Sequence, residues 1–313
     1  MITFIVPTYN SEATIRGCIE SIMKQDVEME IIVVDNNSGD RTREIAQQYP
    51  VKCLFEQKRG AASARNNGLR ECNKNSKYVA FVDSDVVLPQ GWARKAVETL
   101  VKRQEVGGAG GPGISIVKNY VAEIFDSLLF YNSASNKRTE FVKSLATMNV
   151  MYKKSTIADL LFSEDLIAAE DPDFNFRIIN RGQKLLYSTD LWVYHHNPTT
   201  LRRVWLKWFN YGKFYLLPYF RNSRYKEPRL WLRILYVPFL LSAVVLGMLS
   251  GAAMFLAVLI VLSLPFFYGL LGLRLGVRSP TKLVVFSLLH SLKQLAQMLG
   301  IWYGFFLRIV NRL

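Results

Sequence analysis

The feature that most limits how this chain can fold is an uncharged stretch of forty residues, from Ile234 to Leu273. A membrane-spanning helix needs about 20 consecutive apolar residues, so two spans fit within it. We expect a helical hairpin over about 234–273 that turns near residues 247–251. A third apolar segment covers about 282–307, and the polar residues that interrupt it are His290, Lys293, Gln294 and Gln297. A charge at mid-bilayer costs several kcal/mol, so this segment either packs its polar residues against the hairpin or lies in the interface.

The net charge of +14 is unevenly distributed along the chain. Residues 1–198 contain 24 basic and 24 acidic side chains, whereas residues 199–313 contain 15 basic ones and a single acidic one. Aromatic and basic residues alternate between 199 and 233, a mixture that suits the lipid headgroup region. The excess charge therefore indicates membrane topology and contact with anionic lipid, and we expect no nucleic-acid partner.

The same charges predict the topology. Cations flank the expected hairpin on both sides, while its tip near Ser250 has none; they are Arg221, Arg224, Lys226, Arg229 and Arg233 before it, and Arg274, Arg278 and Lys282 after it. By the positive-inside rule both flanks are cytoplasmic, and so is the N-terminal part of the chain. The three cysteines have no C-x-x-C spacing, and residues 1–10 lack the basic start of a secretory signal. We expect a multi-pass protein of the cell membrane with a cytoplasmic N-terminal domain.

The first part of the chain alternates short β-branched runs with segments of helical period. Strand patterns cover 3–6, 30–34, 52–55 and 78–82, and helical patterns cover 11–25, 40–48 and 61–71. This alternation predicts an α/β domain with a mostly parallel sheet and helices on both faces. Ligands of such sheets bind at the carboxyl ends of the strands, where polar clusters follow at 7–10, 35–40, 59–60 and 83–85.

Beyond residue 113 the pattern is looser. Residues 132–143 are polar and predict a loop, 147–152 and 192–194 predict strands, and 169–180 predict a helix. We expect three regions: the α/β domain over 1–198, a basic and aromatic interfacial region over 199–233, and a membrane domain over 234–313.

Two aspartates, Asp83 and Asp85, close the strand pattern of residues 78–82, with Ser84 between them. Hard divalent ions such as Mg²⁺ and Mn²⁺ prefer carboxylate oxygen and often take a substrate phosphate as a further ligand. A solvated acidic turn is the structural alternative, but the position at a strand end favours a divalent-cation site. His195 follows the last strand pattern and is a buried structural histidine, a metal ligand or a diphosphate contact.

Two further acidic clusters have both a structural and a functional interpretation. Asp35 lies where a ligand base docks, whereas Ser38 and Asp40 suit a turn and a helix cap. Glu170, Asp171 and Asp173 begin a helical pattern, and the helix macrodipole alone explains one or two acidic residues there. A carboxylate held near a reacting hydroxyl can also serve as a general base.

Residues 108–113 match the G-x-G-x-x-G pattern of dinucleotide-binding domains. The match follows a charged helix end instead of the first strand, and a proline stands where the phosphate-binding helix should begin. We therefore reject dinucleotide binding and expect a glycine-rich turn that brings the backbone close to a ligand or another strand.

Taken in order, these residues resemble a family 2 glycosyltransferase of the GT-A fold. The matching positions span residues 1 to about 215. They are Val6–Asn10, Glu12, Val33–Ser38, Asp40, Arg59, Gly60, Ala64–Asn66, Gly68, Asp83–Asp85, Gly111, Pro112, Asn149, Glu170, Asp171, Asp173, Arg177, Gly182 and His195.

The resemblance implies a GT-A nucleotide-diphospho-sugar transferase fold and inverting transfer from a nucleotide-diphosphate sugar, with Mn²⁺ or Mg²⁺ as cofactor. It implies Asp171 as the catalytic base, with Glu170 beside it, and Asp85, Asp83 and His195 as the metal site. The donor contacts it implies are Pro7, Tyr9, Glu12, Asp35, Asn37, Arg59, Arg65, Asp83, Ser84 and Asn149. The Gln-x-x-Arg-Trp motif of processive polysaccharide synthases is absent, which favours transfer of a single sugar.

The membrane segments suggest an acceptor linked to a polyprenyl or dolichyl lipid. If the acceptor is a bare lipid phosphate, its oxygen is already ionised and Asp171 need not act as a base; a lipid-linked sugar requires one. The alternative from a different functional class is a membrane scaffold or transport subunit that binds nucleotide without transferase activity. Nucleotidyl transfer onto a lipid phosphate is disfavoured, since no Lys/Arg-rich phosphate loop lies near the first strand.

Overall fold

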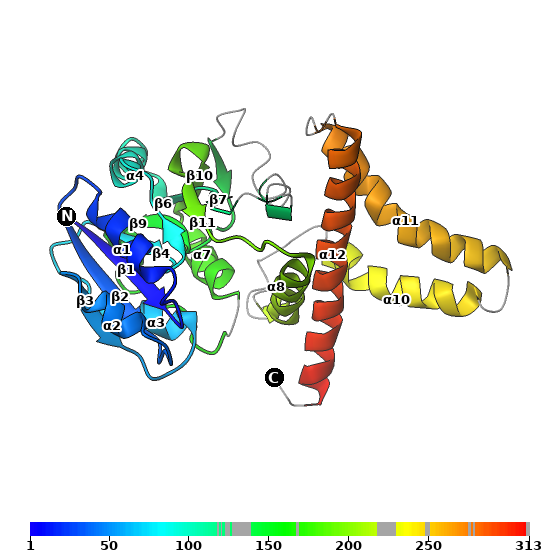
Figure 1. Cartoon of the computed structure of the whole chain (residues 1–313), viewed down its shortest axis with the longest axis horizontal. Helices are drawn as coiled ribbons and strands as arrows, with labels where there is room; N and C mark the ends of the chain where they lie inside the picture. The colour runs from blue at the N-terminus through cyan, green and yellow to red at the C-terminus, as the bar shows by residue number, and fades with distance from the viewer. Residues whose placement is uncertain are drawn as a thin grey trace. The chain divides into compact units, whose positions relative to one another are not determined.

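A computed structural model gives the fold of the chain (Figure 1). It describes residues 1–117, 119, 121–122, 126, 139–166, 169–217, 230–247, 251–274, 277 and 279–310. The chain forms two compact units, one of residues 1–117 and 132–197 and the other of residues 118–131 and 198–313.

The first unit is built on an eight-stranded sheet with the order β3-β2-β1-β4-β9-β6-β10-β8. Its first half is parallel, as the sequence predicts: β1 pairs with β2 and β4, and β2 pairs with β3. These strands are β1 (Ile2–Thr8), β2 (Met29–Asp35), β3 (Lys52–Phe55) and β4 (Tyr78–Val82). Their carboxyl ends therefore meet at one edge of the sheet.

The second half of the sheet is mixed. Strand β9 (Asn149–Lys153) lies antiparallel between β4 and β6 (Val106–Gly110), and β10 (Lys184–Ser188) runs parallel to β6. Strand β8 (Thr139–Val142) pairs antiparallel with β10 at the edge. A small second sheet has the order β5 (Val86–Val87), β11 (Val193–His195) and β7 (Gly113–Ser115). The sheet is thus mostly parallel, with the directions of β9 and of the edge strand β8 reversed.

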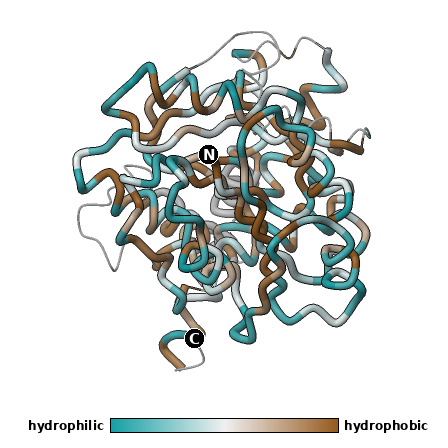
Figure 2. Tube along the Cα trace, turned by 90° about the vertical axis from the view of Figure 1, so that its left-hand side faces the viewer, coloured by the Kyte–Doolittle hydropathy of each residue, from teal (hydrophilic) through white to brown (hydrophobic). Residues whose placement is uncertain are grey.

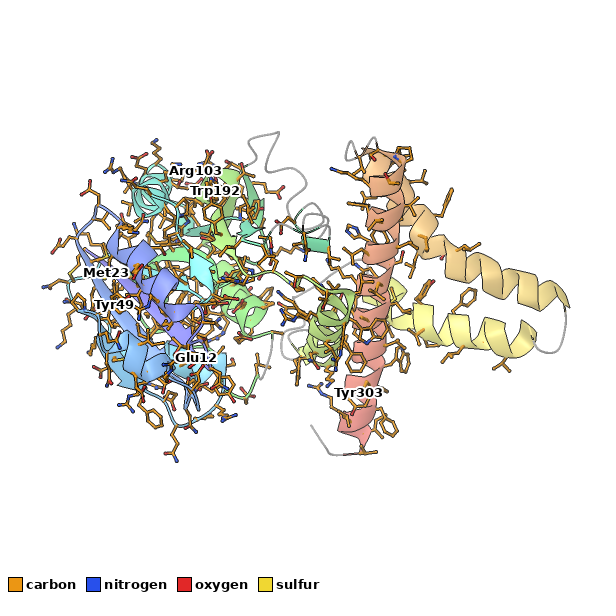
Figure 3. The ribbon with its side chains drawn as sticks, in the orientation of Figure 1. Glu12, Met23, Tyr49, Arg103, Trp192 and Tyr303 are labelled. Carbon is orange, nitrogen blue, oxygen red and sulfur yellow. The ribbon has the colours of Figure 1, made fainter. Side chains whose placement is uncertain are left out.

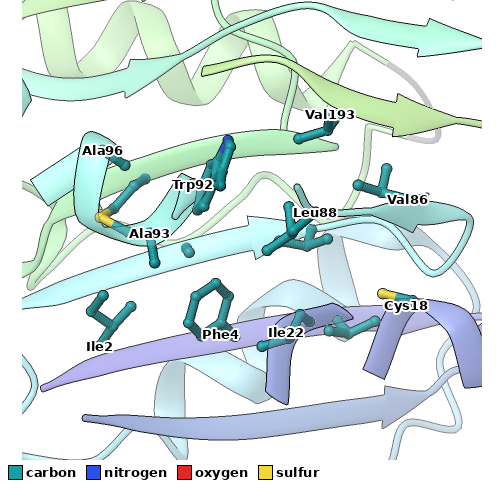
Figure 4. Close-up of a cluster of buried hydrophobic side chains, with 14 of the residues drawn as sticks. Ile2, Phe4, Cys18, Ile22, Val86, Leu88, Trp92, Ala93, Ala96 and Val193 are labelled. Atoms are coloured by element: carbon teal, nitrogen blue, oxygen red, sulfur yellow. The ribbon is translucent and has the colours of Figure 1, made fainter. Parts of the chain in front are cut away.

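Helices cover both faces of the large sheet. Helices α1 (Ile15–Met23), α2 (Thr42–Ala46) and α4 (Trp92–Val101) pack in one core, and α3 (Ala61–Arg70), α6 (Lys154–Ile157) and α7 (Glu170–Asn180) pack in the other. Phe4 and Val6 of β1 belong to the first core and Ile5 to the second, because side chains of a strand alternate between its faces. Figure 4 shows the first core, in which Phe4 faces Trp92, and Figure 2 shows hydrophobic stretches alternating with hydrophilic ones along the trace.

Two expectations about local structure are wrong. Residues 108–110 lie inside β6 instead of a turn, although the close backbone approach expected of these glycines is present. A Cβ on Gly108 would overlap the ring of Tyr152, and one on Gly110 would overlap the backbone oxygen of Asn149. Part of the polar segment 132–143 forms strand β8, and residues 132–138 lie outside the described residues.

The second unit is helical, with α8 (Leu201–Phe214), α10 (Leu230–Gly247), α11 (Gly251–Arg274) and α12 (Pro280–Ile309). Helices α10 and α11 pack against each other and together span the residues of the expected hairpin. Residues 248–250, between the two helices, lie outside the described part. Helix α12 packs so closely on α8 that a Cβ on Gly300 would overlap the backbone oxygen of Phe209. The His290 ring stacks on Tyr268 of α11 with ring centroids 4.6 Å apart, so this polar residue packs against the hairpin.

The helices of the second unit differ in how well their length and hydropathy suit a membrane span. Among the described residues, one helix, α12, meets the length and hydropathy criteria for crossing a membrane. Half of its most apolar window is buried inside the structure, and core helices of soluble proteins meet the same criteria. Residues 218–229 of the expected interfacial region lie outside the described residues.

Candidate active site

A cavity of about 650 Å³ opens at the carboxyl ends of β1 and β4, beside the start of α3. Seven residues implicated by the sequence line it: Pro7, Tyr9, Arg59, Arg65, Asp83, Ser84 and Asp85. Apart from Arg65, which lies on α3, they lie in polar clusters at the strand ends, and the strand-end rule brings them together although the seven residues are up to 78 positions apart in the chain.

An aromatic and a cationic side chain meet in the lining of this cavity. Arg59 Nη1 donates to the Tyr9 hydroxyl at 2.6 Å, and its guanidinium lies 4.6 Å from the centroid of the Tyr9 ring. Tyr9 is 45% exposed, so its ring is accessible to a ligand. Planar aromatic and guanidinium groups are suited to stacking on a nucleotide base.

Asn36 belongs to the matching positions 33–38, but the sequence motifs give it no role among the donor contacts. It is buried, and its Nδ2 donates to the backbone oxygens of Glu56 and Lys58 at 3.1 and 2.7 Å. Its Oδ1 accepts from the Gly60 amide at 2.7 Å. Asn36 therefore fixes the loop that carries Arg59, and its place next to Asp35 at the end of β2 is the signal that could have found it.

Four of the expected donor contacts lie outside the lining of the cavity, and three of them lie near the ends of β1 and β2. Asp35 is buried and accepts from the Ser38 amide at 3.3 Å, while Asn37 adopts a left-handed conformation with φ 60° in the same turn. Glu12, labelled in Figure 3, accepts from the Arg41 amide at 3.2 Å. In this structure these residues organise the loops after β1 and β2.

Asn149 also lies outside the cavity lining and is 1% exposed. Its Nδ2 donates to the backbone oxygen of Leu191 at 2.6 Å, so its amide ties the start of β9 to the short helix η1 (Thr189–Leu191). Its Oδ1 has no hydrogen-bond partner among the described residues.

Arg65 lies at the centre of a cluster of carboxylates. Its Nη2 donates to Asp83 Oδ1 at 3.2 Å, and its Nη1 donates to Glu170 Oε1 at 2.7 Å and to Asp171 Oδ1 at 3.4 Å. The Arg65 side chain is 5% exposed. It joins α3, the end of β4 and the start of α7, a relation that the sequence spacing does not reveal.

Both carboxylate oxygens of Asp171 accept hydrogen bonds from Thr147. The Thr147 hydroxyl donates to its Oδ1 at 2.7 Å, and the Thr147 amide donates to its Oδ2 at 3.1 Å. Ala169, just before these carboxylates, adopts φ 68°, a left-handed conformation that costs a residue with a Cβ about 1–2 kcal/mol. Strain of this kind is found at functional sites, where it aims side chains.

Glu170 differs from its neighbour in its surroundings. Its side chain is 13% exposed, and burial, reinforced by the adjacent charge of Asp171, raises the pKa of Glu170 to about 7. Arg65 acts in the opposite direction and favours the ionised form. Glu170 therefore exchanges its proton near neutral pH.

The residues expected to bind a metal do not form a closed site. Asp85 Oδ2 lies 3.5 Å from His195 Nε2, whereas Asp83 pairs with Arg65. Within the described residues, no three His, Cys, Asp or Glu side chains are grouped as metal ligands. The Asp85 carboxylate in the open cavity nevertheless fits a divalent ion that takes its other ligands from donor phosphates and water.

The model of the family described as glycosyl transferase family 2 matches residues 3–160, about half of the chain. The chain belongs to glycosyl transferase family 2. The resemblance to family 2 glycosyltransferases that the sequence motifs indicate is therefore confirmed.

Curated relatives are distant. An uncharacterised glycosyltransferase of Bacillus subtilis, EpsJ, is 25% identical over 239 residues, which cover 65% of this chain and 63% of EpsJ. The glycosyltransferase AglE of Haloferax volcanii is 26% identical over 232 residues, or 68% of this chain and 72% of AglE. The dolichyl N-acetyl-α-D-glucosaminyl phosphate 3-β-D-2,3-diacetamido-2,3-dideoxy-β-D-glucuronosyltransferase of Methanococcus voltae is 26% identical over 231 residues, or 67% of this chain and 71% of that enzyme. The chain thus spans less than two thirds of EpsJ.

Solved structures share the fold. The Pyrobaculum calidifontis mannosyltransferase PcManGT, in complex with GDP-mannose and Mn²⁺, aligns with a TM-score of 0.59 at 21% identity, over 95% of this chain and 86% of that chain. Staphylococcus aureus TarS 1–349 with UDP-GlcNAc aligns with a TM-score of 0.52 at 17% identity, covering 99% and 92%. These similarities confirm the expected α/β GT-A fold.

Proposed function

We propose that this glycosyltransferase moves one sugar, with inversion, from a nucleotide-diphosphate sugar to a lipid-linked acceptor at the cytoplasmic face of a membrane. The observation that carries the lipid acceptor is an apolar groove of about 510 Å³ in the helical unit. The dolichyl substrate in the name of the Methanococcus voltae relative is consistent with it.

The donor side of the proposal rests on the 650 Å³ cavity. Tyr9 and Arg59 would bind the base and ribose, and Asp83 and Ser84 would face the ribose and diphosphate. Asp85, with Asp83 and His195 nearby, would hold Mn²⁺ or Mg²⁺. When bound, such an ion supplies positive charge where the leaving diphosphate becomes more negative.

On the acceptor side, Asp171 would accept the proton of the attacking hydroxyl. Its two hydrogen bonds from Thr147 fix the orientation of the carboxylate, which a general base requires. Attack from the face opposite the departing diphosphate inverts the anomeric carbon. Glu170 is instead paired with Arg65 Nη1 at 2.7 Å, and its carboxylate lacks the two hydrogen bonds from Thr147 that orient Asp171.

The apolar groove would hold the lipid of the acceptor. Helices α8, α10, α11 and α12 all contribute to its lining, which is apolar apart from Tyr236 and Ser291. The lining residues are Leu201, Tyr236, Leu264, Pro265, Val285, Leu288, Leu289, Ser291, Leu292 and Leu295. Arg202 and Arg203 are exposed next to Leu201 on α8. The apolar groove and two cationic side chains are therefore close together on α8, which suits a lipid that has a prenyl chain and an anionic phosphate.

Filling this groove tests the lipid acceptor. In Leu288→Trp, the KM for a long-chain prenyl-linked acceptor is expected to rise about tenfold, the effect of losing about two buried methylenes at 0.8 kcal/mol each. The KM for the donor and for a short-chain acceptor should stay unchanged. Val284→Trp is the matched control, because Val284 is equally exposed on α12 but does not line the groove. Equal effects of the two variants would argue against the groove.

The membrane topology is part of the proposal. Helices α10 and α11 would form a hairpin with both flanks in the cytoplasm, since the cations flank it and its tip has none. Single cysteines at Ser250 and Asn311 report the topology when an impermeant thiol reagent is added to intact cells. We expect Ser250→Cys to be labelled. Its protection would refute the hairpin, and labelling of Asn311→Cys would indicate a third span.

The activity itself is tested with purified full chain in detergent, Mn²⁺ and a panel of UDP-, GDP- and dTDP-sugars, with and without polyprenyl phosphate or a prenyl-diphosphate glycan. We expect one donor to be consumed and its sugar to enter the lipid extract. Transfer to a water-soluble glycan that proceeds equally well without lipid would overturn the lipid-linked acceptor while leaving the family activity intact.

A further inference from the structure

Arg65 makes more contacts than a donor-binding residue needs. It lines the donor cavity, yet its hydrogen bonds reach carboxylates on two different elements, Asp83 after β4 and Glu170 and Asp171 at the start of α7. A planar guanidinium suits this arrangement, because its two terminal nitrogens point in fixed directions toward two partners.

Stability alone does not explain this cluster. A buried ion pair is often no more stabilising than well-packed apolar residues of the same volume. Arg65 Nε is also buried with no hydrogen-bond partner in the described part of the chain, and an unpaired buried N–H costs about 1–3 kcal/mol. The guanidinium also lies over the Phe162 ring, 5.5 Å from its centroid. The carboxylates, more than the packing, set its position.

We propose that Arg65 is a positioning residue that couples the donor cavity to the base of the reaction: it holds the start of α7 in register with Asp83 and supplies the counter-charge of Glu170. The inference rests on the proposed function for its catalytic consequence. Asp83 at the donor cavity and the start of α7 then share one partner, so that a disturbance on either side reaches the other.

The charges around Glu170 define what Arg65 contributes. Asp171 and Asp173 lie on its own helix, Asp83 follows β4, and Arg65 lies on α3. Tyr152 of β9 donates to Asn175 of the helix that carries Glu170. Asp173 is paired with Arg177 at 2.9 Å and so already has a counter-charge. Arg65 is the cation that contacts Glu170 directly, and removing it disfavours the ionised form.

The first test measures Glu170 without donor or acceptor. Glu side-chain carboxyls are labelled with ¹³C in the full chain in detergent, and the Glu170 signal is identified by its loss in Glu170→Gln. We expect a titration midpoint near 7 in the wild type and one at least about one unit higher in Arg65→Gln. In Arg65→Lys the charge is kept, so the midpoint should stay within about half a unit of the wild type.

The second test measures transfer with the donor that the panel identifies. In Arg65→Lys, turnover is expected to fall about 10- to 100-fold, because one ammonium cannot bridge both sides, while donor affinity changes less than about threefold. Arg70→Gln is the control, since Arg70 lies on the same helix but is exposed and pairs with Glu164. It should leave turnover and the Glu170 titration unchanged.

Each result has a defined meaning. If donor KM rises in Arg65→Lys while turnover is kept, Arg65 is a donor contact and the coupling is wrong. If turnover and the Glu170 midpoint both equal the wild type and only thermal stability falls, the role is structural and the proposal is overturned. The lysine variant keeps the buried charge, so it tests the proposal even where the glutamine variant does not fold. The titration uses neither donor nor acceptor. Its result therefore tests the role of Arg65 even if the proposal of a lipid-linked acceptor is wrong.

Discussion

Asp171→Asn is expected to retain donor affinity and to lose turnover by about 10²- to 10⁴-fold, the usual contribution of a positioned general base. The amide keeps the shape of the side chain, and its one oxygen can still accept one of the two hydrogen bonds from Thr147, so the start of α7 should remain in place. What it lacks is the capacity to take a proton. Donor affinity by fluorescence titration and single-turnover rates on a lipid-linked sugar measure the two effects separately.

Asp173→Asn serves as the control for this experiment. Asp173 lies two residues away on the same helix but accepts from Ser163 and Arg177 and does not face the Arg65 cluster. Its turnover should stay within a few-fold of the wild type. Near wild-type turnover in Asp171→Asn would instead show that Glu170 is the base or that the acceptor is a phosphate, whose oxygen is ionised without help.

The sequence predicted the parallel half of the sheet well because its signals are local. The strand patterns over 52–55 and 78–82 coincide with β3 and β4, and the polar residues after β1 and β4 meet in one cavity. In an α/β domain the carboxyl ends of parallel strands share an edge by geometry, so no long-range information is needed.

The mixed half of the sheet was harder to predict for a physical reason. A strand buried on both faces has the same apolar pattern whichever way it runs, so the antiparallel direction of β9 leaves no signal in residues 149–153. The glycines of β6 suggest a turn by composition. In the structure they are required because Tyr152 and the backbone of β9 lie against them.

The site shows the same division between local and long-range information. Asp83 and Asp85 are found from their strand end, whereas the bridge from Arg65 to Glu170 joins residues 105 positions apart. Thr147 and Asn36 are ordinary polar residues until the fold brings them against Asp171 and the loop of Arg59. Contacts of this kind depend on the packing of α3 and α7 on the sheet, which periodicity does not encode.

Asp85→Ala is expected to remove the Mn²⁺-dependent part of donor affinity while leaving the fold intact. Losing one partner of a charge interaction costs about 2 kcal/mol or more, which corresponds to about 30-fold in affinity. The side chain of Asp85 is 35% exposed, and His195 keeps its other contact, to Asn197 at 2.7 Å, so little structural stability is at risk.

The measurement compares donor affinity with Mn²⁺ and with EDTA in wild type, Asp85→Ala and Asp26→Ala, with thermal unfolding as the check on folding. Asp26 is a suitable control because it is an exposed aspartate that pairs with Arg94 on the surface. In the wild type and in Asp26→Ala, EDTA should weaken binding, whereas Asp85→Ala should bind the donor weakly under both conditions. If Mn²⁺ strengthens binding to Asp85→Ala as much as to the wild type, the cation is held elsewhere. Asp83, which already neutralises Arg65, would then have to serve two cations at once, and the donor phosphates would have to supply most of the ligands.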